Sequence, residues 1–382
     1  MSRSRRPLDG AVLDLTRQRG VVTRLELAES LGVTPATITN IVKRLLADGL
    51  LVEHGHSAST GGKRRTLLRL NPASKYALGL SFDRVRLTVA LTDYAGGLVG
   101  QAVTAMPSDG AALDEAVRKT LTALGVTPTE VAGIGLADPV SNATPWLPAA
   151  VTEPVLSPDT VERIGATVDG PVVIRDEATC AALGELWTGS TSATDCFATV
   201  YMSDQITAGL VLNGLAHDTE PRGSLGHMSI DLDGPPCPCG ARGCVDVLAS
   251  PAAVVAHVLT NGAHAVRLGL AGSPASRATD FSKIARAAVQ GDRTCLTAIT
   301  DAAAALAVGV ANLVTVLGLN RIFLTGPGFA DAGGIYQRVI TDRLALVHRK
   351  GTPSVTVTLS TLDLEAAAIG AATLVLQSSV GF

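Results

Sequence analysis

The sequence predicts an α/β protein in two parts: a winged helix-turn-helix over residues 1–70, then a body of two α/β lobes over residues 71–382 that carries a knuckle-like loop at 227–246. At 382 residues the chain is too long for one ordinary core, so two or three folding units are expected. Residues 1–70 hold 12 Lys and Arg against 6 Asp and Glu, whereas the whole chain has a net charge of −3. A basic start joined to an acidic body is typical of a nucleic-acid-binding segment with a second unit attached.

Three short helices are expected before residue 50. The first should end at Gly20. Thr23 and Glu26 have the spacing of a capping box, which predicts the start of the second helix. Thr34 is a natural N-cap for the third helix, with Pro35 at the first helical position, where the missing N–H costs nothing.

This arrangement predicts a partner, double-stranded DNA. A capped second helix that begins with small polar residues is typical of a helix-turn-helix, in which that helix enters the major groove. Two short strands, 50–52 and 66–70, flank a basic tip that suits a wing against the adjacent minor groove. The alternative is a three-helix protein-interaction module with an ordinary solvated charge run. The expected DNA-binding residues are Thr34, Thr37, Asn40, Lys43, Arg44, Lys63, Arg64 and Arg65.

The body shows strand-like runs that alternate with helices, which indicates a mixed α/β sheet. The first expected strands are 76–82, 86–91, 98–105, 131–136 and 172–175. A similar order returns with strands 196–202, 210–212, 321–325 and 355–359, helices near 251–260, 281–290 and 298–317, and a final helix near 364–376. Two such lobes place a ligand site in the cleft between them.

The most apolar run, 302–319, is interrupted by Gly309, Asn312 and Gly318, which favours a buried core helix over a membrane span. No signal peptide is apparent, and three cysteines are scattered outside the loop. Free thiols and a thiolate metal site both suit a reducing compartment, so a cytoplasmic protein is expected.

The loop at 227–246 gathers three of the six cysteines and a histidine. A structural zinc ion takes four ligands in a tetrahedron, and three thiolates with one imidazole satisfy it. The surrounding glycines and prolines suit a tight turn folded over an ion. The alternatives are a disulfide or unrelated thiols beside a buried histidine. We expect structural Zn²⁺ bound by His227, Cys237, Cys239 and Cys244.

The same loop resembles the ROK family of repressors, open reading frames and kinases, whose members carry Glu-x-Gly-His followed by Cys-x-Cys-Gly-x-x-Gly-Cys-x-Glu. The cysteine half is intact here as CPCGARGC and is followed by Asp246, but Ser224 stands where the family has its first glutamate. The resemblance covers nearly the whole chain. It implies the two-lobed actin-like ATPase fold of ROK sugar kinases for residues 71–382.

The resemblance also indicates that ATP binding has been lost. ROK kinases place glycine-rich turns around the phosphates, because only glycine lets the backbone come so close. The first turn, 81–85, reads SFDRV here, and the second, 203–207, reads SDQIT. The third retains Gly326 and Gly328 with Pro327 between them. Three altered turns together argue against a kinase.

The catalytic segment of the kinases, Asn-Asp-Ala-Asn, aligns with 176–179, which places Glu177 at the catalytic aspartate. Misplacing a reacting group by about 1 Å can cost roughly a hundredfold in rate, so no enzyme activity is expected. A register shifted by one residue would make Asp176 the base instead, and a solvated carboxylate pair at a strand end is the plain alternative. The resemblance carries the sugar-binding positions onto Asp176, Glu177, Ser224, His227 and Asp246.

The predicted function is therefore a cytoplasmic, zinc-stabilised ROK-type transcriptional regulator, expected to repress genes of sugar metabolism and to respond to a sugar-like effector. A homodimer is expected because helix-turn-helix proteins read half-sites about 34–36 Å apart, and a tetramer stays open. One alternative is an ATP-dependent carbohydrate kinase with an appended DNA-binding domain. Another is a regulator whose DNA binding needs no ligand.

Overall fold

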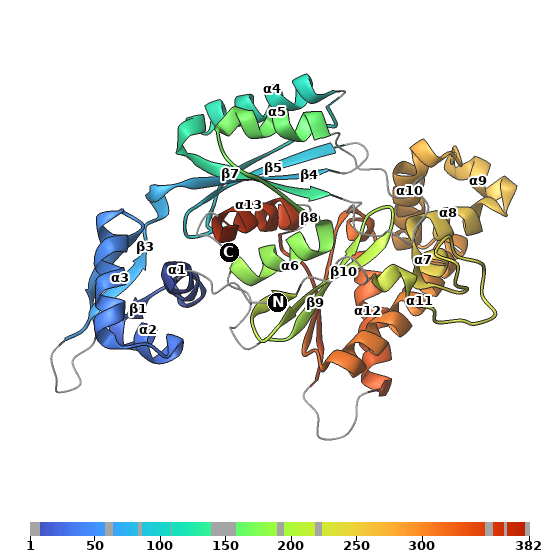
Figure 1. Ribbon diagram of the computed structural model, residues 1–382. Coiled ribbons are helices and arrows are strands. Elements are labelled where there is room, and N and C mark those ends of the chain that lie inside the picture. Colours follow the sequence, from blue (N-terminus) through green and yellow to red (C-terminus); the bar gives the residue numbers. More distant parts are fainter. Residues whose placement is uncertain are drawn as a thin grey trace.

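The computed structural model describes residues 8–57, 64–82, 86–107, 109–138, 158–188, 195–217, 224–347, 354–362 and 365–378. Figure 1 shows a small N-terminal unit, in blue, at one side of a larger body that contains two separate sheets. Helices α6 (Glu177–Trp187) and α13 (Ala366–Ser378) lie between the two sheets.

The N-terminal unit contains the three expected helices and a small sheet. Its helices are α1 (Leu8–Arg19), α2 (Arg24–Leu31) and α3 (Pro35–Ala47), and its strands are β1 (Val22–Thr23), β2 (Leu51–His56) and β3 (Thr66–Leu70), in the order β1-β3-β2. The capping box is confirmed, because the N–H of Glu26 donates to Thr23 Oγ1 at 3.3 Å and the N–H of Thr23 donates to the Glu26 carboxylate at 2.7 Å. Gly32 ends α2 in the left-handed region with φ 65°.

Helix α3 begins as the sequence predicts. Thr34 is its N-cap and accepts a hydrogen bond from the N–H of Thr37 at 3.3 Å, and Pro35 occupies the first turn. One face of the helix is buried against α1 and α2 through Ile38, Ile41, Val42 and Leu45. The opposite face is therefore available to a partner.

The first lobe is built on a five-stranded mixed sheet. Its strands are β4 (Tyr76–Phe82), β5 (Arg86–Asp93), β6 (Leu98–Ala105), β7 (Val131–Asp138) and β8 (Val172–Asp176), in the order β6-β5-β4-β7-β8. Strands β4, β5 and β6 are antiparallel neighbours, whereas β7 and β8 join in parallel. Helices α4 (Gly110–Ala123) and α5 (Pro158–Val168) cover one face and α13 the other (Figure 1).

The second lobe repeats this topology, as the recurring pattern in the sequence predicts. Its strands are β9 (Phe197–Met202), β10 (Ile206–Leu212), β11 (Leu215–His217), β12 (Arg321–Thr325) and β13 (Thr356–Leu359), in the order β11-β10-β9-β12-β13. Strand β10 is longer than expected, because Ile206 pairs with Met202 and closes a hairpin. Two polar residues, Asp204 and Gln205, directly precede Ile206, so the sequence pattern did not reveal the first half of the strand.

Helices fill the rest of the second lobe. They are α7 (Val245–Ala249), α8 (Pro251–Leu259), α9 (Gly262–Leu268), α10 (Arg277–Val289), α11 (Arg293–Leu317) and α12 (Gly333–Val347). Among the described residues, only α11 is long and apolar enough to cross a membrane by length and composition. Its alanine-rich face lies in the core of the second lobe, beside α10 and α12, as expected of a core helix. Helices α9 and α12 were not predicted individually.

Helices α6 and α13 hold the lobes together at backbone distance. A Cβ placed on Gly370 of α13 would lie 1.6 Å from the carbonyl oxygen of Cys180 in α6. A Cβ on Gly209 of β10 would lie 2.0 Å from the carbonyl oxygen of Ala178. Only glycine permits contacts this close, so α6 is fixed against α13 on one side and against the second sheet on the other.

Candidate DNA surface, metal centre and ligand site

The exposed face of α3 carries the predicted base-reading residues. Asn40 and Lys43 are exposed, and Thr37 is half-buried beside the cap. Residues at 37, 40 and 44 follow helical spacing, so they share one face. Arg44 has a partner within the unit, because its Nε lies 3.0 Å from Asp9 Oδ2 and braces α3 against α1. To contact a DNA phosphate, Arg44 would have to give up its ion pair with Asp9.

The hairpin made by β2 and β3 is closed just below its tip. The N–H of Ser57 donates to the Arg65 carbonyl at 2.8 Å, and the N–H of Arg65 donates to Ser57 Oγ at 3.2 Å. Arg64 and Arg65 are both exposed. Lys63, the third residue predicted for this wing, lies outside the described residues.

The four predicted metal ligands come together. The donor atoms of His227, Cys237, Cys239 and Cys244 all lie within 4.8 Å of one another. Cys239 Sγ is 3.7 Å from Cys244 Sγ, and Cys237 Sγ is 3.4 Å from His227 Nδ1. All three thiols are free, which removes the disulfide alternative.

These distances fit a zinc ion. With Zn–S bonds of about 2.3 Å and Zn–N bonds of about 2.0–2.1 Å, the edges of the tetrahedron are about 3.8 Å for S···S and about 3.5 Å for S···N. Burial raises the pKa of the Cys244 thiol to about 12, so a metal ion bound there would displace its proton. Burial also lowers the pKa of His227, which favours the neutral ring that a metal needs.

Backbone hydrogen bonds fold the loop over this site. The N–H of Cys237 donates to the Ala241 carbonyl at 2.9 Å, and the N–H of Gly243 donates to the Pro235 carbonyl at 2.8 Å. Gly243 has φ 56°, and a Cβ there would lie 1.8 Å from the carbonyl oxygen of Asp231. The loop geometry therefore depends on glycine at 243 as much as on the cysteines.

Two of the predicted ligand residues, Glu177 and Asp246, accept hydrogen bonds from one turn of the second lobe, residues 203–206. Ser203 Oγ donates to the Glu177 carboxylate at 3.2 Å, and the N–H of Ile206 donates to Asp246 Oδ1 at 3.0 Å. Gly226 packs against Asp246, which brings the segment from Ser224 to His227 to the same place. We call this cluster, formed by 176–177, 203–206, 224–227 and 246, the ligand site.

Two carboxylates of the ligand site, those of Glu177 and Asp246, are withdrawn from solvent. Glu177 is only 4% exposed. Burial raises the pKa of Asp246 to about 6. Asp176 is the N-cap of α6 and accepts from the N–H of Thr179 at 2.8 Å, so one of its oxygens has a structural task. The alternative of a solvated carboxylate pair is therefore wrong for Glu177.

Asp138 is a further carboxylate that the sequence pattern did not single out. It ends β7, is 7% exposed, and is the register partner of Asp176 at the end of the parallel strand β8. The carboxyl ends of neighbouring parallel strands meet at one edge of a sheet, which is where open α/β sheets bind ligands. Its position depends on strand register, which local spacing does not reveal.

The turns that would hold phosphates in a kinase are used differently here. Asp204, in the second turn, faces Arg277 Nη1 at 3.9 Å. In the third turn, a Cβ on Gly326 or Gly328 would lie within 2.7 Å of Met202, so close packing on β9 accounts for both glycines. Residues 83–85 of the first turn lie outside the described residues. In the second and third turns, the N–H groups of Ser203, Ile206, Phe329 and Ala330 donate to acceptors within the protein.

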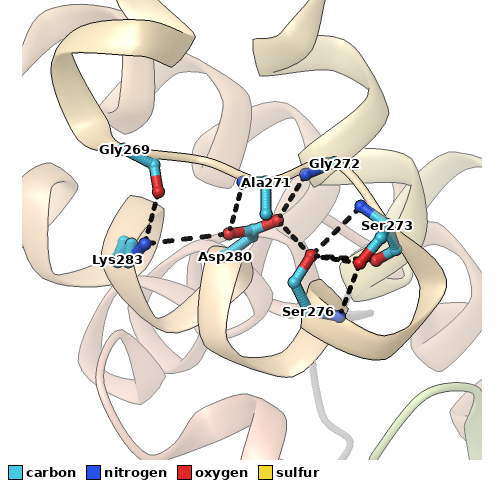
Figure 2. A network of polar contacts seen from close by, with 7 residues as sticks. All are labelled: Gly269, Ala271, Gly272, Ser273, Ser276, Asp280 and Lys283. Carbon is cyan, nitrogen blue, oxygen red and sulfur yellow. Dashed lines mark hydrogen bonds and ion pairs between the residues drawn. The ribbon is translucent and has the colours of Figure 1, made fainter.

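Figure 2 shows a polar network at the turn that precedes α10, the helix that begins at Arg277. The fully buried Asp280 accepts from the N–H groups of Ala271 and Gly272 at 3.1 and 2.9 Å and from Ser276 Oγ at 2.8 Å. Burial opposes ionisation of Asp280, but these hydrogen bonds outweigh it and lower the pKa, so the carboxyl stays ionised. The turn that precedes α10 is thereby fixed, and with it the start of the helix that bears Arg277.

A surface groove of about 580 Å³ lies elsewhere, on the outer side of the first lobe between β6 and α4. Its lining includes Ala102, Thr104, Ala116 and Lys119 and none of the ligand-site residues. The groove is therefore separate from the ligand site and from the metal loop.

Comparison with known proteins accounts for both units of the chain. A family model described as ROK family matches residues 86–378. A model described as iron dependent repressor, N-terminal DNA binding domain, matches residues 10–58, which contain α1 to α3 and the first wing strand. The two matches together cover most of the N-terminal unit and most of both lobes, and residues 59–85 lie between them.

Relatives with similar length are named as repressors. The xylose repressor of Bacillus spizizenii is 22% identical over 370 residues, which are 93% of this chain and 91% of that protein. The xylose repressor of Caldicellulosiruptor bescii is 24% identical over 326 residues, 82% of this chain and 81% of that one. The Escherichia coli DNA-binding transcriptional dual regulator NagC is 25% identical over 65% of this chain and 64% of its own.

Solved structures show the same fold. A ROK family transcriptional regulator, homologous to the E. coli MLC protein, superposes with a TM-score of 0.71 over 97% of this chain and 95% of that chain at 20% identity. A ROK family glucokinase from Streptomyces griseus superposes with a TM-score of 0.57 over 78% of this chain and 98% of its own at 22% identity. The kinase thus matches the body without the N-terminal unit. The chain belongs to the ROK family and is one of its DNA-binding transcriptional regulators.

Proposed function

We propose that this protein is a sugar-responsive repressor that binds operator DNA through α3 and the β2–β3 wing. One observation carries the proposal: the buried Glu177 and the partly buried Asp246 lie beside a metal loop, while the turns 81–85 and 203–207 contain none of the glycines that a kinase places around phosphates. The relatives named as xylose repressors and the N-acetylglucosamine repressors of E. coli support a sugar or a sugar derivative as the effector class.

The DNA surface follows from the exposed residues of the N-terminal unit. Thr37 and Asn40 would reach base edges, while Lys43 and Arg64 would meet phosphates. Thr34 holds the helix start that presents them, and Arg44 and Arg65 would extend the basic border; the sequence alone adds Lys63 to this set. We infer a homodimer that places two α3 helices about 34–36 Å apart, the spacing of successive major grooves on one side of DNA.

Zinc in this protein would be structural. His227, Cys237, Cys239 and Cys244 fill all four positions of a tetrahedral site, so no position stays open for a water molecule or substrate. The ion would tie the segment of His227 to that of Asp246, which both line the ligand site. A cytoplasmic location suits the free thiols and the DNA partner.

The effector would be held by carboxylates that accept hydrogen bonds from its hydroxyl groups. Glu177, Asp176 and Asp246 supply acceptors, and Ser224 replaces the family's glutamate with a group that both donates and accepts. Several carboxylates lie here, and Arg277 is already paired with Asp204, so a neutral or amino sugar suits the site better than a sugar phosphate. We place the boundary between the DNA-binding domain and this effector-binding domain between residues 70 and 71.

The kinase alternative requires the family's glycine-rich phosphate turns, and all three are altered in this sequence. Asp204 would place negative charge against a phosphate, and its partner Arg277 is already paired with it. Glu177 is also longer than the aspartate that the family uses as a base. A regulator that binds a sugar without phosphorylating it needs no phosphate contact at Asp204 and no catalytic base at Glu177.

DNA binding can be tested by fluorescence anisotropy with duplexes from the DNA upstream of the protein's own gene, over a range of salt concentrations. Lys43→Ala and Arg64→Ala should each flatten the slope of log affinity against log salt by about 1, because one phosphate contact is lost. Lys119→Ala is the matched control, since Lys119 is 75% exposed on α4 of the body. Slopes unchanged in the first two variants would remove those residues from the interface.

A further inference from the structure

The N-terminal unit is packed onto the body rather than tethered to it. One buried cluster contains Val12 and Leu13 of α1 together with Tyr94, Val375 and Leu376 of the body. Such shared apolar packing fixes the orientation of two units, because each loses buried area if they separate. The position of the DNA-reading helix therefore depends on the surface that the body offers to α1.

Arg17 makes the most specific contact of this junction. Its side chain is 3% exposed, and its guanidinium lies 4.6 Å above the ring of Trp187 and 5.3 Å from that of Tyr94. It donates to the Tyr94 carbonyl at 3.4 Å and pairs with Asp14 at 3.1 Å. A charge withdrawn from water is costly unless it is paired, and a cation over an aromatic ring is attracted more strongly when it is desolvated.

The body holds Trp187 firmly in this position. Gly96 lies beneath its ring with φ 91°, and a Cβ at that residue would be 2.7 Å from Trp187 Cε3. The indole is thus enclosed between the turn after β5 and the guanidinium of Arg17. A movement of Trp187 would have to move Arg17 or break the contact.

Trp187 is the last residue of α6, and Glu177 is the first. The helix of 11 residues is about 16 Å long, and nine of its residues are buried. Its backbone touches α13 at Gly370 and β10 at Gly209. At these two points no side chain lies between the backbones that could adjust if α6 moved. The first turn of α6 contains Glu177 of the ligand site, and its last residue, Trp187, contacts Arg17 of the N-terminal unit.

We propose that α6 is the coupling element of this regulator, and that the contact of Arg17 with Trp187 and Tyr94 is the joint through which the ligand site and the DNA unit affect one another. This inference rests on the proposed function. A ligand that binds at Glu177 shifts α6 as a rigid body, and Trp187 carries the shift to α1 and hence to α3. Energetic coupling between two binding sites is reciprocal, so DNA on α3 must also act on the first turn of α6.

Reciprocity allows a test that needs no identified effector. Amide hydrogen exchange is measured with and without duplexes from the DNA upstream of the protein's own gene, and the readout is the segment 176–183. In the wild-type protein, DNA should change the exchange rate there by about fivefold or more, since coupling factors of that size are typical. Arg17→Met should abolish the change while retaining an apolar side chain over Trp187.

Arg321→Met is the matched control, because Arg321 also stacks on an aromatic ring, that of Phe323 at 5.7 Å, but lies in the second lobe. It should leave the DNA-dependent change intact. If wild-type protein binds DNA and the exchange of 176–183 does not change, α6 is not the coupling element, whatever the fate of the variants. If wild-type protein binds none of the duplexes, the proposed regulator fails, and the coupling fails with it.

Discussion

The metal loop and the ligand site lie side by side and share the segments of His227 and Asp246, yet they relate to the family pattern in opposite ways. The loop retains every donor, and its distances match a zinc tetrahedron. In the ligand site, the family resemblance places Glu177, Ser224 and Asp246 where ROK kinases carry Asp, Glu and Glu. A site that binds a ligand without transferring phosphate is expected to keep its scaffold while its chemistry changes.

The largest effect should come from breaking the metal loop. Cys239→Ser should lower zinc content well below the roughly one ion per chain expected of the wild type, and should lower the Tm by roughly 10 °C, because binding energy for structural zinc is folding energy. Elemental analysis and thermal unfolding measure both. Cys196→Ser, at a half-exposed cysteine outside the loop, should change neither. A fully stable Cys239→Ser protein would show that the loop holds without metal.

The ligand site should respond in affinity rather than in stability. Glu177→Gln replaces a buried carboxyl oxygen with an amide nitrogen that cannot accept a hydrogen bond, which should weaken sugar binding by about ten- to a hundredfold, since a buried polar group left unsatisfied costs about 1–3 kcal/mol. Calorimetric titration with the effector measures this loss, and DNA affinity without effector should stay unchanged. Glu115→Gln on the exposed side of α4 is the control. Equal sugar affinity in both variants would remove Glu177 from the site.

The smallest effect is expected at the altered phosphate turn. Arg277→Gln removes an ion pair of 3.9 Å between partly exposed side chains, which is worth about 0–1 kcal/mol and so a shift in Tm of at most about 3 °C. Arg286 lies on the same helix as Arg277, and Arg286→Gln, which breaks its ion pair with Asp331, should have a similarly small effect on the Tm. A Tm loss near that of Cys239→Ser would mean that this turn of the ligand site is as firmly built as the metal loop, so the two regions would not differ in the way proposed.

Features encoded within a few residues were predictable from the sequence. The capping box of Thr23 and Glu26, the cap at Thr34 and the four metal donors all depend on short spacings, and each lies where it was expected. The repeated strand order also predicted two lobes. Local capping and ligand spacing set these features, so distant parts of the chain do not alter them.

Features that join distant segments could not be predicted. Asp138 meets Asp176 only through strand register, and Arg277 meets Asp204 only through the packing of α10 against the second lobe. Arg17 has the look of an ordinary surface residue in the sequence, yet it is buried on Trp187. Asp9, which pairs with Arg44, belongs to no sequence motif that would have identified it. These partners are selected by tertiary packing, which residue spacing does not encode.

A ligand site that reads a sugar to control DNA binding must release that sugar without phosphorylating it. The decisive experiment is a single sample with the protein, labelled upstream DNA, ATP with Mg²⁺, and one sugar at a time from a panel of pentoses, hexoses and amino sugars. Anisotropy reports DNA release, and the recovered sugar is analysed for phosphate. We expect that one sugar class releases the DNA and is recovered unchanged. Accumulation of a sugar phosphate, or DNA binding indifferent to every sugar, would show that the protein is not a sugar-responsive repressor of this kind.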